Sequence, residues 1–304
     1  MNQKSKKRRH ASETWFIIAS LIIPVFIFIV FYIVPNFSAF FMAFQGRGGN
    51  WTFDNFKRVW EVVSRPDSDL RIAIQNTFLA FAINVVAYPF KVLVPYFIYK
   101  KVPFSGFYRI VFFLPTIIFG VATSLIFMQM ISPNGEIAKL VGELVGLDYA
   151  PDLLADSRFA NWVIFLEMLW MGFPGDLIIW GGTFARIPND LMEAGRLDGT
   201  NWWTEFTKIV VPMVWPTVGL QMVLLTCNLF SSGGNVFLLT QGEYGTMTIG
   251  AWLQIQLLQG SGISYTSNVY NYMSAVGLCI TVIAIVLATL VRKNANKAFQ
   301  EVEF

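Results

Sequence analysis

The sequence predicts an all-α integral membrane protein with six transmembrane helices. Of its 304 residues, 55% are hydrophobic and only 13% are charged, whereas soluble domains carry about 25% charged residues. The apolar residues gather in stretches of roughly 20 residues, the length that an α-helix needs to cross the hydrocarbon core of a bilayer. The net charge of +3 is small and dispersed, so it gives no indication of a nucleic-acid partner.

The first span is expected at residues 14–34, after a basic tail at residues 1–13. A cleavable signal peptide is the competing interpretation, but the apolar run is too long and lacks a small-residue cleavage site. Residues 35–71 then form an extracytoplasmic segment. The remaining spans are expected at about residues 72–99, 107–131, 161–183, 209–231 and 270–291, followed by a tail at residues 292–304.

The basic residues set the orientation, because cytoplasmic loops of membrane proteins are enriched in Lys and Arg. With the N-terminus inside, the predicted inner segments hold most of the Lys and Arg residues. The segment at residues 232–269 has none, as an outer loop should. We therefore expect a multi-pass protein with both termini in the cytoplasm. The acidic outer loop at residues 132–160 is either simply solvated or part of a landing surface for an extracytoplasmic partner.

A short, charge-dense stretch between two long apolar spans is the elbow, residues 188–208. Asp190 and Glu193 occupy the start of its predicted first helix, where the helix dipole favours acidic side chains. Asp198-Gly199 is a typical turn signal, because glycine reverses the chain at little cost. The pattern predicts two short helices with a bend between them, projecting on the cytoplasmic side.

The elbow resembles the EAA loop of binding-protein-dependent ABC importer permeases. That loop has the pattern Glu-Ala-Ala, Gly and Ile-x-Leu-Pro at fixed spacings, which this sequence matches through Glu193-Ala194-Gly195, Gly199 and Ile209-x-Val211-Pro212. It departs at Gly195 and Val211, where the pattern has alanine and leucine. Weaker matches extend the resemblance over residues 71–291 and favour the carbohydrate-importer branch: Asn76-Thr77, Arg109 with Phe113-Leu114-Pro115, Gly172-Phe173-Pro174, and Phe237-Leu238-Leu239-Thr240 with Thr246.

The resemblance implies a type I ABC importer permease fold, with a transmembrane domain at residues 72–291 and the elbow as coupling loop. It also implies partners: a second permease subunit, expected to be a different chain, two cytoplasmic ATPase subunits, and an extracytoplasmic binding protein that delivers a sugar or oligosaccharide. The location would be the cell membrane of a prokaryote. The sequence contains no G-x-x-x-x-G-K-[ST] phosphate-binding motif, so ATP and Mg²⁺ are expected in the ATPase subunits and no cofactor in this chain.

On this resemblance, the first helix of the elbow docks into a groove of the ATPase. Glu193 would make the orienting polar contact, Ala194 and Gly195 would allow close approach, and Gly199 would supply the bend. The expected coupling residues are Leu191, Met192, Glu193, Ala194, Gly195 and Gly199. The alternative is that Glu193 is only a solvated first-turn acid, which stabilises its helix by about 0.3–1 kcal/mol.

A solute path through an apolar bundle must be lined by polar groups, because such groups are costly elsewhere in a membrane. One face of the fifth span supplies them, through Gln221, Leu225, Asn228 and Ser232. Trp170, Phe230 and Tyr272 are possible stacking neighbours for a sugar ring. The resemblance adds solute contacts near Gly172 and Gly175 in the fourth span. Asn228 and Gln221 have an open alternative, which is hydrogen bonding between helices.

Glu167 and Asp176 in the fourth span raise a different function, an ion-coupled secondary transporter that needs no ATPase. More often such acids pair with a neighbour or lie near an interface. We expect Lys91 to extend toward the cytoplasmic head groups. A permease of the same family that carries a non-sugar solute is the other alternative for the function.

The residues offer little for a membrane enzyme. The one histidine, His10, lies in the basic tail. Cys227 and Cys279 lie in apolar runs, where they fit small core residues better than a disulfide or a metal site.

Overall fold

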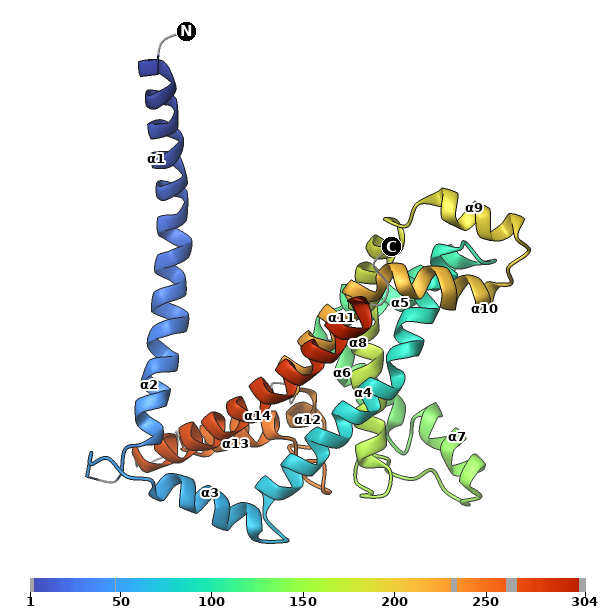
Figure 1. Ribbon diagram of the computed structural model, residues 1–304. Helices are drawn as coiled ribbons and strands as arrows, with labels where there is room; N and C mark the ends of the chain where they lie inside the picture. Colours follow the sequence, from blue (N-terminus) through green and yellow to red (C-terminus); the bar gives the residue numbers. More distant parts are fainter. Residues whose placement is uncertain (1–2, 47, 231–233, 261–266, 301–304) are drawn as a thin grey trace. The chain divides into compact units, whose positions relative to one another are not determined.

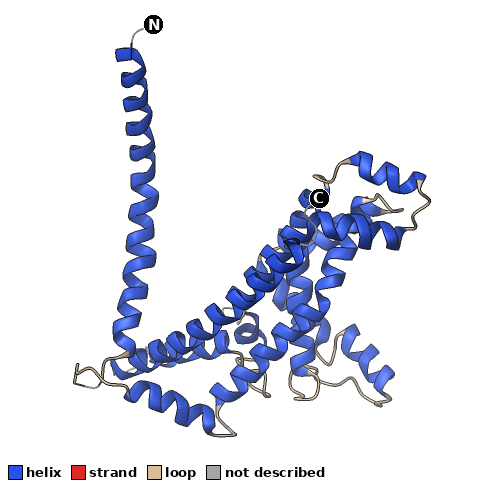
Figure 2. Cartoon of the chain, in the orientation of Figure 1, coloured by secondary structure: helices blue, strands red, loops and turns tan. Residues whose placement is uncertain are grey.

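The computed structural model describes residues 3–46, 48–230, 234–260 and 267–300, which form helices joined by short connections (Figure 1, Figure 2). These residues contain no strand, only an isolated antiparallel bridge between Gln45 and Trp51. The all-α prediction is confirmed. The chain divides into two compact units, Met1–Glu61 with Ile263–Cys279, and Val62–Gly262 with Ile280–Phe304.

The first unit contains a nearly continuous apolar helix, made of α1 (Gln3–Phe28), the π-helical turn η1 (Ile29–Ile33) and α2 (Val34–Ala43). It extends beyond both ends of the expected span at residues 14–34. Pro35 near the start of α2 does not break the helix, because the wider π turn before it accommodates the missing N–H. None of the most apolar part of this helix is buried within the chain, so lipid or another subunit must cover it.

Hydrogen bonds from asparagine side chains connect the end of α2 to the other helices of the first unit. The Asn55 amide nitrogen, in α3 (Asp54–Ser64), donates to the carbonyl oxygens of Ala43 and Gln45 at 3.0 and 2.9 Å. Asn271, in α14 (Ser267–Gln300), also donates to Gln45, at 2.9 Å. The Arg58 guanidinium lies 4.6 Å from the centre of the Tyr272 ring. Tyr272 is therefore covered by an arginine.

Among the described residues, five helical stretches are long and apolar enough to cross a membrane, and a bent pair of helices makes a sixth if the pair counts as one span. That agrees with the six spans expected. The stretches that lie largely in the second unit are built from α4 (Asp69–Tyr99), α8 (Ala160–Phe184), α10 (Trp202–Glu205) with η2 (Phe206–Val210) and α11 (Val211–Cys227), and the later part of α14.

The third span was expected at residues 107–131, and the structure divides this stretch into two helices. The structure has α5 (Ser105–Ile117) and α6 (Gly120–Ile131), which meet at an angle of 108°. Ile118, between them, has an extended backbone with ψ of 141°, and Gly120 begins the second helix. The pair is therefore a broken span or a re-entrant loop.

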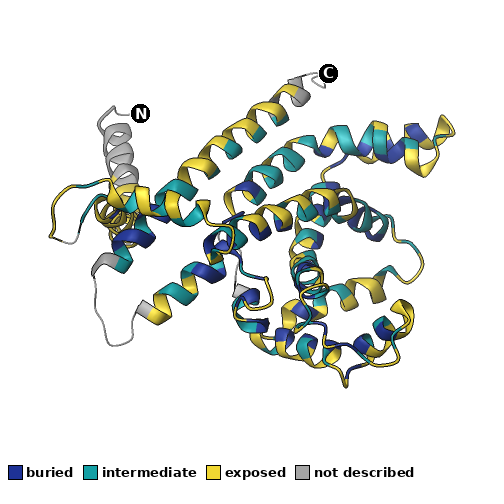
Figure 3. Cartoon of the chain, turned by 90° about the horizontal axis from the view of Figure 1, so that it is seen from below, coloured by how far each residue is buried: buried dark blue, intermediate teal, exposed yellow. Residues whose placement is uncertain are grey.

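Helices α4 and α8 form the centre of the second unit. Tyr96 of α4 and Trp180 and Phe184 of α8 are fully buried, and the Trp180 and Phe184 rings stack with centres 5.8 Å apart. Along the helices of the chain, buried residues alternate with half-buried and exposed ones (Figure 3). Cys227 is exposed and Cys279 is half-buried, and both are free thiols. The prediction of a core position is thus wrong for Cys227.

Three further helices lie in segments that the sequence left as loops: α7 (Glu136–Val145), α12 (Gly234–Leu239) and α13 (Ile249–Gly260). The turn between α12 and α13 is tied to α4. The Asn76 amide nitrogen donates to the carbonyl oxygens of Gly245 and Met247 at 2.6 and 2.9 Å, and the Thr77 hydroxyl accepts from the backbone of Ile249 at 3.0 Å. The expected outer loop at residues 232–269 is therefore largely structured where it is described.

Candidate coupling element and solute path

The elbow is a helix, a turn and a second helix, as the sequence predicts. Helix α9 (Asn189–Leu197) carries Asp190 in its first turn and Arg196 in its last, so both charges complement the helix dipole. Gly199 follows with φ of +72°, a left-handed conformation that glycine adopts without strain. The chain then enters α10, where the Asn201 side chain caps the helix by accepting from the Thr204 backbone at 2.8 Å.

Helix α9 has one face packed on the protein and one face exposed. Met192 and Gly195 face inward, while Leu191, Glu193 and Ala194 are exposed. Gly195 was expected to allow close approach of an ATPase. Instead, a Cβ atom at Gly195 would lie 2.8 Å from Cδ1 of Ile209. The close approach at this glycine is therefore within the chain, and the expectation for Gly195 is corrected.

Met192 likewise belongs to the interior. It packs in the cluster that contains Trp180, Phe184, Phe206 and Val210. These residues come from α8 and from the helix that continues the elbow into the membrane. The expected docking role of Met192 is corrected in the same way: its side chain seats α9 on the bundle.

A buried acid anchors the second half of the elbow. Glu205 is 2% exposed, and its carboxylate lies 2.7 Å from the Lys100 ammonium through both oxygens. The Tyr96 hydroxyl donates to the same carboxylate at 2.8 Å. Lys100 and Tyr96 stand at the end of α4, so this cluster joins α10 to α4. The sequence analysis missed it, although a single acid at the edge of an apolar stretch was a usable signal, because a buried carboxylate needs partners.

Leu197 is a second feature that the sequence analysis missed. It ends α9 and is 89% exposed, more than any other leucine among the described residues. An apolar side chain at the tip of a polar elbow suits contact with a protein surface, and its position one helical turn after Glu193 was the signal available.

The expected solute-path residues of the fifth span share a helix only in part. Gln221 and Leu225 are half-buried in α11, which ends at Cys227, so that Asn228 lies exposed at the helix end. Ser232 lies outside the described residues. Within the described residues, the predicted stripe therefore consists of Gln221 and Leu225 in α11 and of Asn228 at the helix end.

The aromatic neighbours proposed for a sugar ring have other contacts. Phe230 is buried and its ring meets that of Phe78 edge-on, with centres 5.9 Å apart. The Trp170 ring packs beside that of Phe127, with ring centres 5.9 Å apart. As Tyr272 is covered by Arg58, these rings serve packing in this structure.

Gly172 and Gly175 of α8 are exposed and leave open space. No atom lies within 4 Å of a Cβ built at Gly175, and only the Lys91 ammonium comes that close at Gly172, at 3.9 Å. The Lys91 ammonium lies 3.5 Å from the Asp176 carboxylate and 3.1 Å from the Asn84 amide oxygen. The pairing predicted for Asp176 is confirmed. The prediction that Lys91 extends to the head groups is wrong, because Asp176 holds it.

Glu167, the other acid of the fourth span, is fully buried. Its carboxylate accepts hydrogen bonds from the Ser124 hydroxyl, at 2.8 Å, and from the Asn235 amide. These contacts join α8 to α6 and α12. Pairing with neighbours, the more frequent role of such acids, is thus confirmed for Glu167 as well.

Known proteins share this sequence pattern and fold. The chain is 24% identical over 285 residues to the multiple sugar-binding transport system permease protein MsmF of Streptococcus mutans, covering 91% of this chain and 94% of MsmF. It is 25% identical over 284 residues to the osmoprotective compounds uptake permease protein GgtC of Synechocystis, covering 90% of this chain and 98% of GgtC. No protein-family model matches the chain.

Solved structures of ABC transporters share the fold of this chain. A crystal structure of a bacterial alginate ABC transporter, in complex with an alginate pentasaccharide-bound periplasmic protein, contains a chain that superimposes with a TM-score of 0.81. The match covers 96% of this chain and 97% of that one at 21% identity. The chain therefore resembles ABC transporter permeases in sequence and in fold.

Proposed function

We propose that this permease is the transmembrane subunit of an ATP-driven importer for a sugar or oligosaccharide. The observation that carries the proposal is the elbow, whose α9 is seated on the bundle by Met192 and Gly195 while Leu191, Glu193 and Ala194 face outward. The relation to MsmF, which covers almost the whole of both chains, supports the choice of a sugar.

The outward face of α9 is the proposed docking surface for an ATPase subunit. Glu193 supplies a charge that can orient the partner, and Leu191, Ala194 and Leu197 supply apolar contact. Met192 and Gly195 contribute by seating the helix. A push on α9 then passes through Ile209 and through the Glu205–Lys100 ion pair into α11 and α4. Such a rigid-body movement is an established way to switch between two states.

The partners follow from what one chain lacks. Without a phosphate-cradling motif in the sequence, the energy must come from two separate ATPase subunits. A second permease, expected to be a different chain, would complete the path and cover apolar surface such as that of Trp15–Ala43. An extracytoplasmic binding protein would deliver the solute, as the periplasmic protein in the alginate transporter complex suggests.

The solute path is proposed to run past Gly172 and Gly175, where α8 leaves open space, and past the half-buried face of α11. Asn228 offers an amide for sugar hydroxyls, and Gln221 and Leu225 lie deeper on the same helix. This path requires the elbow, the N-terminus and the C-terminus to be cytoplasmic. Membrane-impermeant thiol labelling of single cysteines at Leu197 and Glu136 checks that orientation, since only the Glu136→Cys variant should react from outside.

Reconstitution tests the function. The permease is placed in proteoliposomes with a second permease, ATPase subunits and a binding protein, and uptake of labelled sugars is measured with and without ATP. We expect uptake that requires both ATP and the binding protein. Uptake without ATP hydrolysis would contradict the proposal and favour ion coupling.

A non-sugar cargo is the second candidate, because the GgtC relative is named for osmoprotective compounds. The same proteoliposomes separate the two possibilities. Competition of sugar uptake by a panel of small zwitterionic and polyol osmolytes identifies the class of cargo, and the binding protein's thermal shift with each compound provides an independent measurement.

A further inference from the structure

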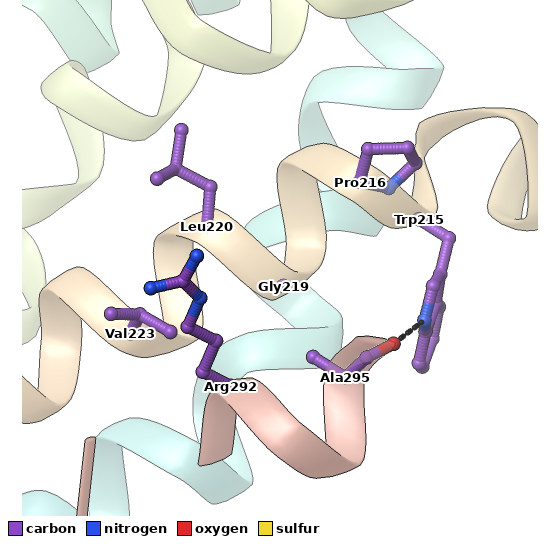
Figure 4. A pocket seen from close by; sticks show the side chains of 7 residues that line it. All are labelled: Trp215, Pro216, Gly219, Leu220, Val223, Arg292 and Ala295. Atoms are coloured by element: carbon purple, nitrogen blue, oxygen red, sulfur yellow. Dashed lines mark hydrogen bonds between the residues drawn. The ribbon is translucent and has the colours of Figure 1, made fainter. Parts of the chain in front are cut away.

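A groove between α11 and the end of α14 is separate from both the elbow face and the proposed solute path. Its volume is about 440 Å³. The groove is drawn in Figure 4, and its lining consists of Trp215, Pro216, Gly219, Leu220 and Val223 from α11 with Arg292 and Ala295 from α14. The lining is apolar apart from the Arg292 guanidinium and the edge of the Trp215 ring.

The two helices are held in fixed register at the groove. The Trp215 indole nitrogen donates to the Ala295 carbonyl oxygen at 3.2 Å. Gly219 forms the floor, where a Cβ atom would lie 3.0 Å from that of Ala295. The groove is therefore a feature of the packing between the helices and does not depend on a mobile loop.

Arg292 gives the groove its charge. Its side chain reaches from α14 toward α11 between Leu220 and Val223 (Figure 4). In the part of the chain that the structure describes, Arg292 forms no ion pair. A guanidinium is well suited to a phosphate because its N–H groups match two phosphate oxygens at once.

The groove lies where a membrane surface would be. Arg292, Lys293 and Lys297 come at the end of the apolar stretch Val269–Ala295, and such basic residues next to a span attract anionic lipids. Trp215 fits the same depth, because tryptophan is enriched at membrane–water interfaces. The bond from Trp215 to Ala295 places this end of α14 beside the start of α11, the end that carries the elbow.

We infer that this groove binds the head group of one anionic glycerophospholipid. Arg292 would hold the phosphate, and Pro216, Leu220 and Val223 would contact the glycerol backbone and the first methylene groups of the acyl chains. A soluble phosphate compound would leave these apolar side chains without a role, which is why a lipid fits better. The inference does not depend on the direction of transport or on the identity of the cargo.

The test measures lipid retained by the purified full-length permease. The protein is exchanged into detergent containing equal amounts of phosphatidylglycerol and phosphatidylcholine, and bound lipid is counted by native mass spectrometry. We expect one tightly held phosphatidylglycerol. The Arg292→Gln variant should lose roughly tenfold in its affinity, the effect of removing one charge-assisted contact. Arg292→Lys, which keeps the charge without the paired N–H groups, should fall between the two.

Lys293→Gln is the matched control, because it removes a neighbouring charge that does not line the groove. It should change retention by less than about twofold, as expected for an exposed charge. Equal loss in Lys293→Gln and Arg292→Gln would show general attraction to a basic surface and overturn the inference. So would equal retention of phosphatidylcholine, or equally tight binding of soluble glycerol phosphate.

A second measurement distinguishes a lipid from a protein neighbour. A photo-reactive side chain at Leu220 should crosslink to lipid in native membranes. A crosslink to the second permease instead would show that a protein covers the groove, and would also overturn the inference. Thermal unfolding of each variant confirms that it has folded, so that lost retention reports on binding.

Discussion

The Lys100 ammonium lies 2.7 Å from both carboxylate oxygens of Glu205, and this ion pair joins the last turn of α4 to the short helix that leads out of the elbow. The Tyr96 hydroxyl completes the cluster at 2.8 Å. Glu205 is almost fully buried, so the pair fixes the geometry of the junction. A displaced elbow must therefore carry the end of α4 with it.

Lys100→Met should destabilise the permease strongly, because it leaves the Glu205 carboxylate buried with only Tyr96 as a partner. Removing one member of a buried pair costs about 3–5 kcal/mol, and the lower end is expected since Lys100 is partly exposed. Thermal unfolding measures the effect. The double variant Lys100→Met with Glu205→Gln should recover part of the loss, and Lys101→Met, at an exposed neighbouring position, should have little effect. Equal stability of the Lys100→Met and Lys101→Met variants would contradict this prediction.

Glu193→Lys should separate folding from coupling. Glu193 is exposed and makes no described contact that its loss would break, so the free energy of unfolding should change by less than about 0.5 kcal/mol. ATP hydrolysis by the assembled transporter should no longer drive uptake. Leu197→Asp should act the same way. The measurements are uptake in proteoliposomes and co-purification of the ATPase subunits; unaltered uptake in both variants would rule out α9 as the docking face.

The elbow could be predicted because its signals are local. Acidic residues at a helix start and an Asp-Gly turn act within a few residues of where they stand, and Gly199 indeed has a positive φ. Its orientation could not be predicted in the same way. Leu191 and Met192 are adjacent and both apolar, and only the packing of α9 on α8 and α11 decides that Met192 faces inward.

Ion pairs between residues far apart along the chain could not be predicted from the sequence for a related reason. Glu205 meets Lys100, and Asp176 meets Lys91, across large separations along the chain. The break at Ile118 between α5 and α6 had a weak local signal in Pro115 and Gly120, yet proline and glycine also occur inside unbroken membrane helices. The 108° angle accompanies contacts of α5 with α8 and of α6 with α12, which come from distant parts of the chain.

Gly195→Ala should destabilise the elbow, because the new methyl group would lie 2.8 Å from Cδ1 of Ile209. Overpacking costs about 1–3 kcal/mol. The net loss should lie near the lower end of that range, because Cδ1 is the far end of a flexible side chain and alanine favours a helix over glycine by about 1 kcal/mol. The rescue is specific: Ile209→Val removes the very Cδ1 atom in conflict, so the double variant Gly195→Ala with Ile209→Val should regain most of the lost stability. Thermal unfolding of the two single variants and the double variant measures this coupling. Purely additive effects would show that the two residues do not meet.

Lys91 and Asp176 should show the same non-additivity inside the membrane. Lys91→Met leaves the Asp176 carboxylate with no cation, and Asp176→Asn leaves the Lys91 ammonium with only the Asn84 amide, so each single change should cost several kcal/mol, on the order of 3–5. The double variant removes both charges, so its stability should be closer to that of the unaltered protein.

Tyr88→Phe is the matched control, because the Tyr88 hydroxyl is buried without a hydrogen-bond partner among the described residues. Its removal should leave stability unchanged or slightly raised. If instead the single variants fold normally but import fails, the pair acts on the solute or on the movement of α4 against α8, and uptake measured beside thermal unfolding distinguishes that outcome from a structural role.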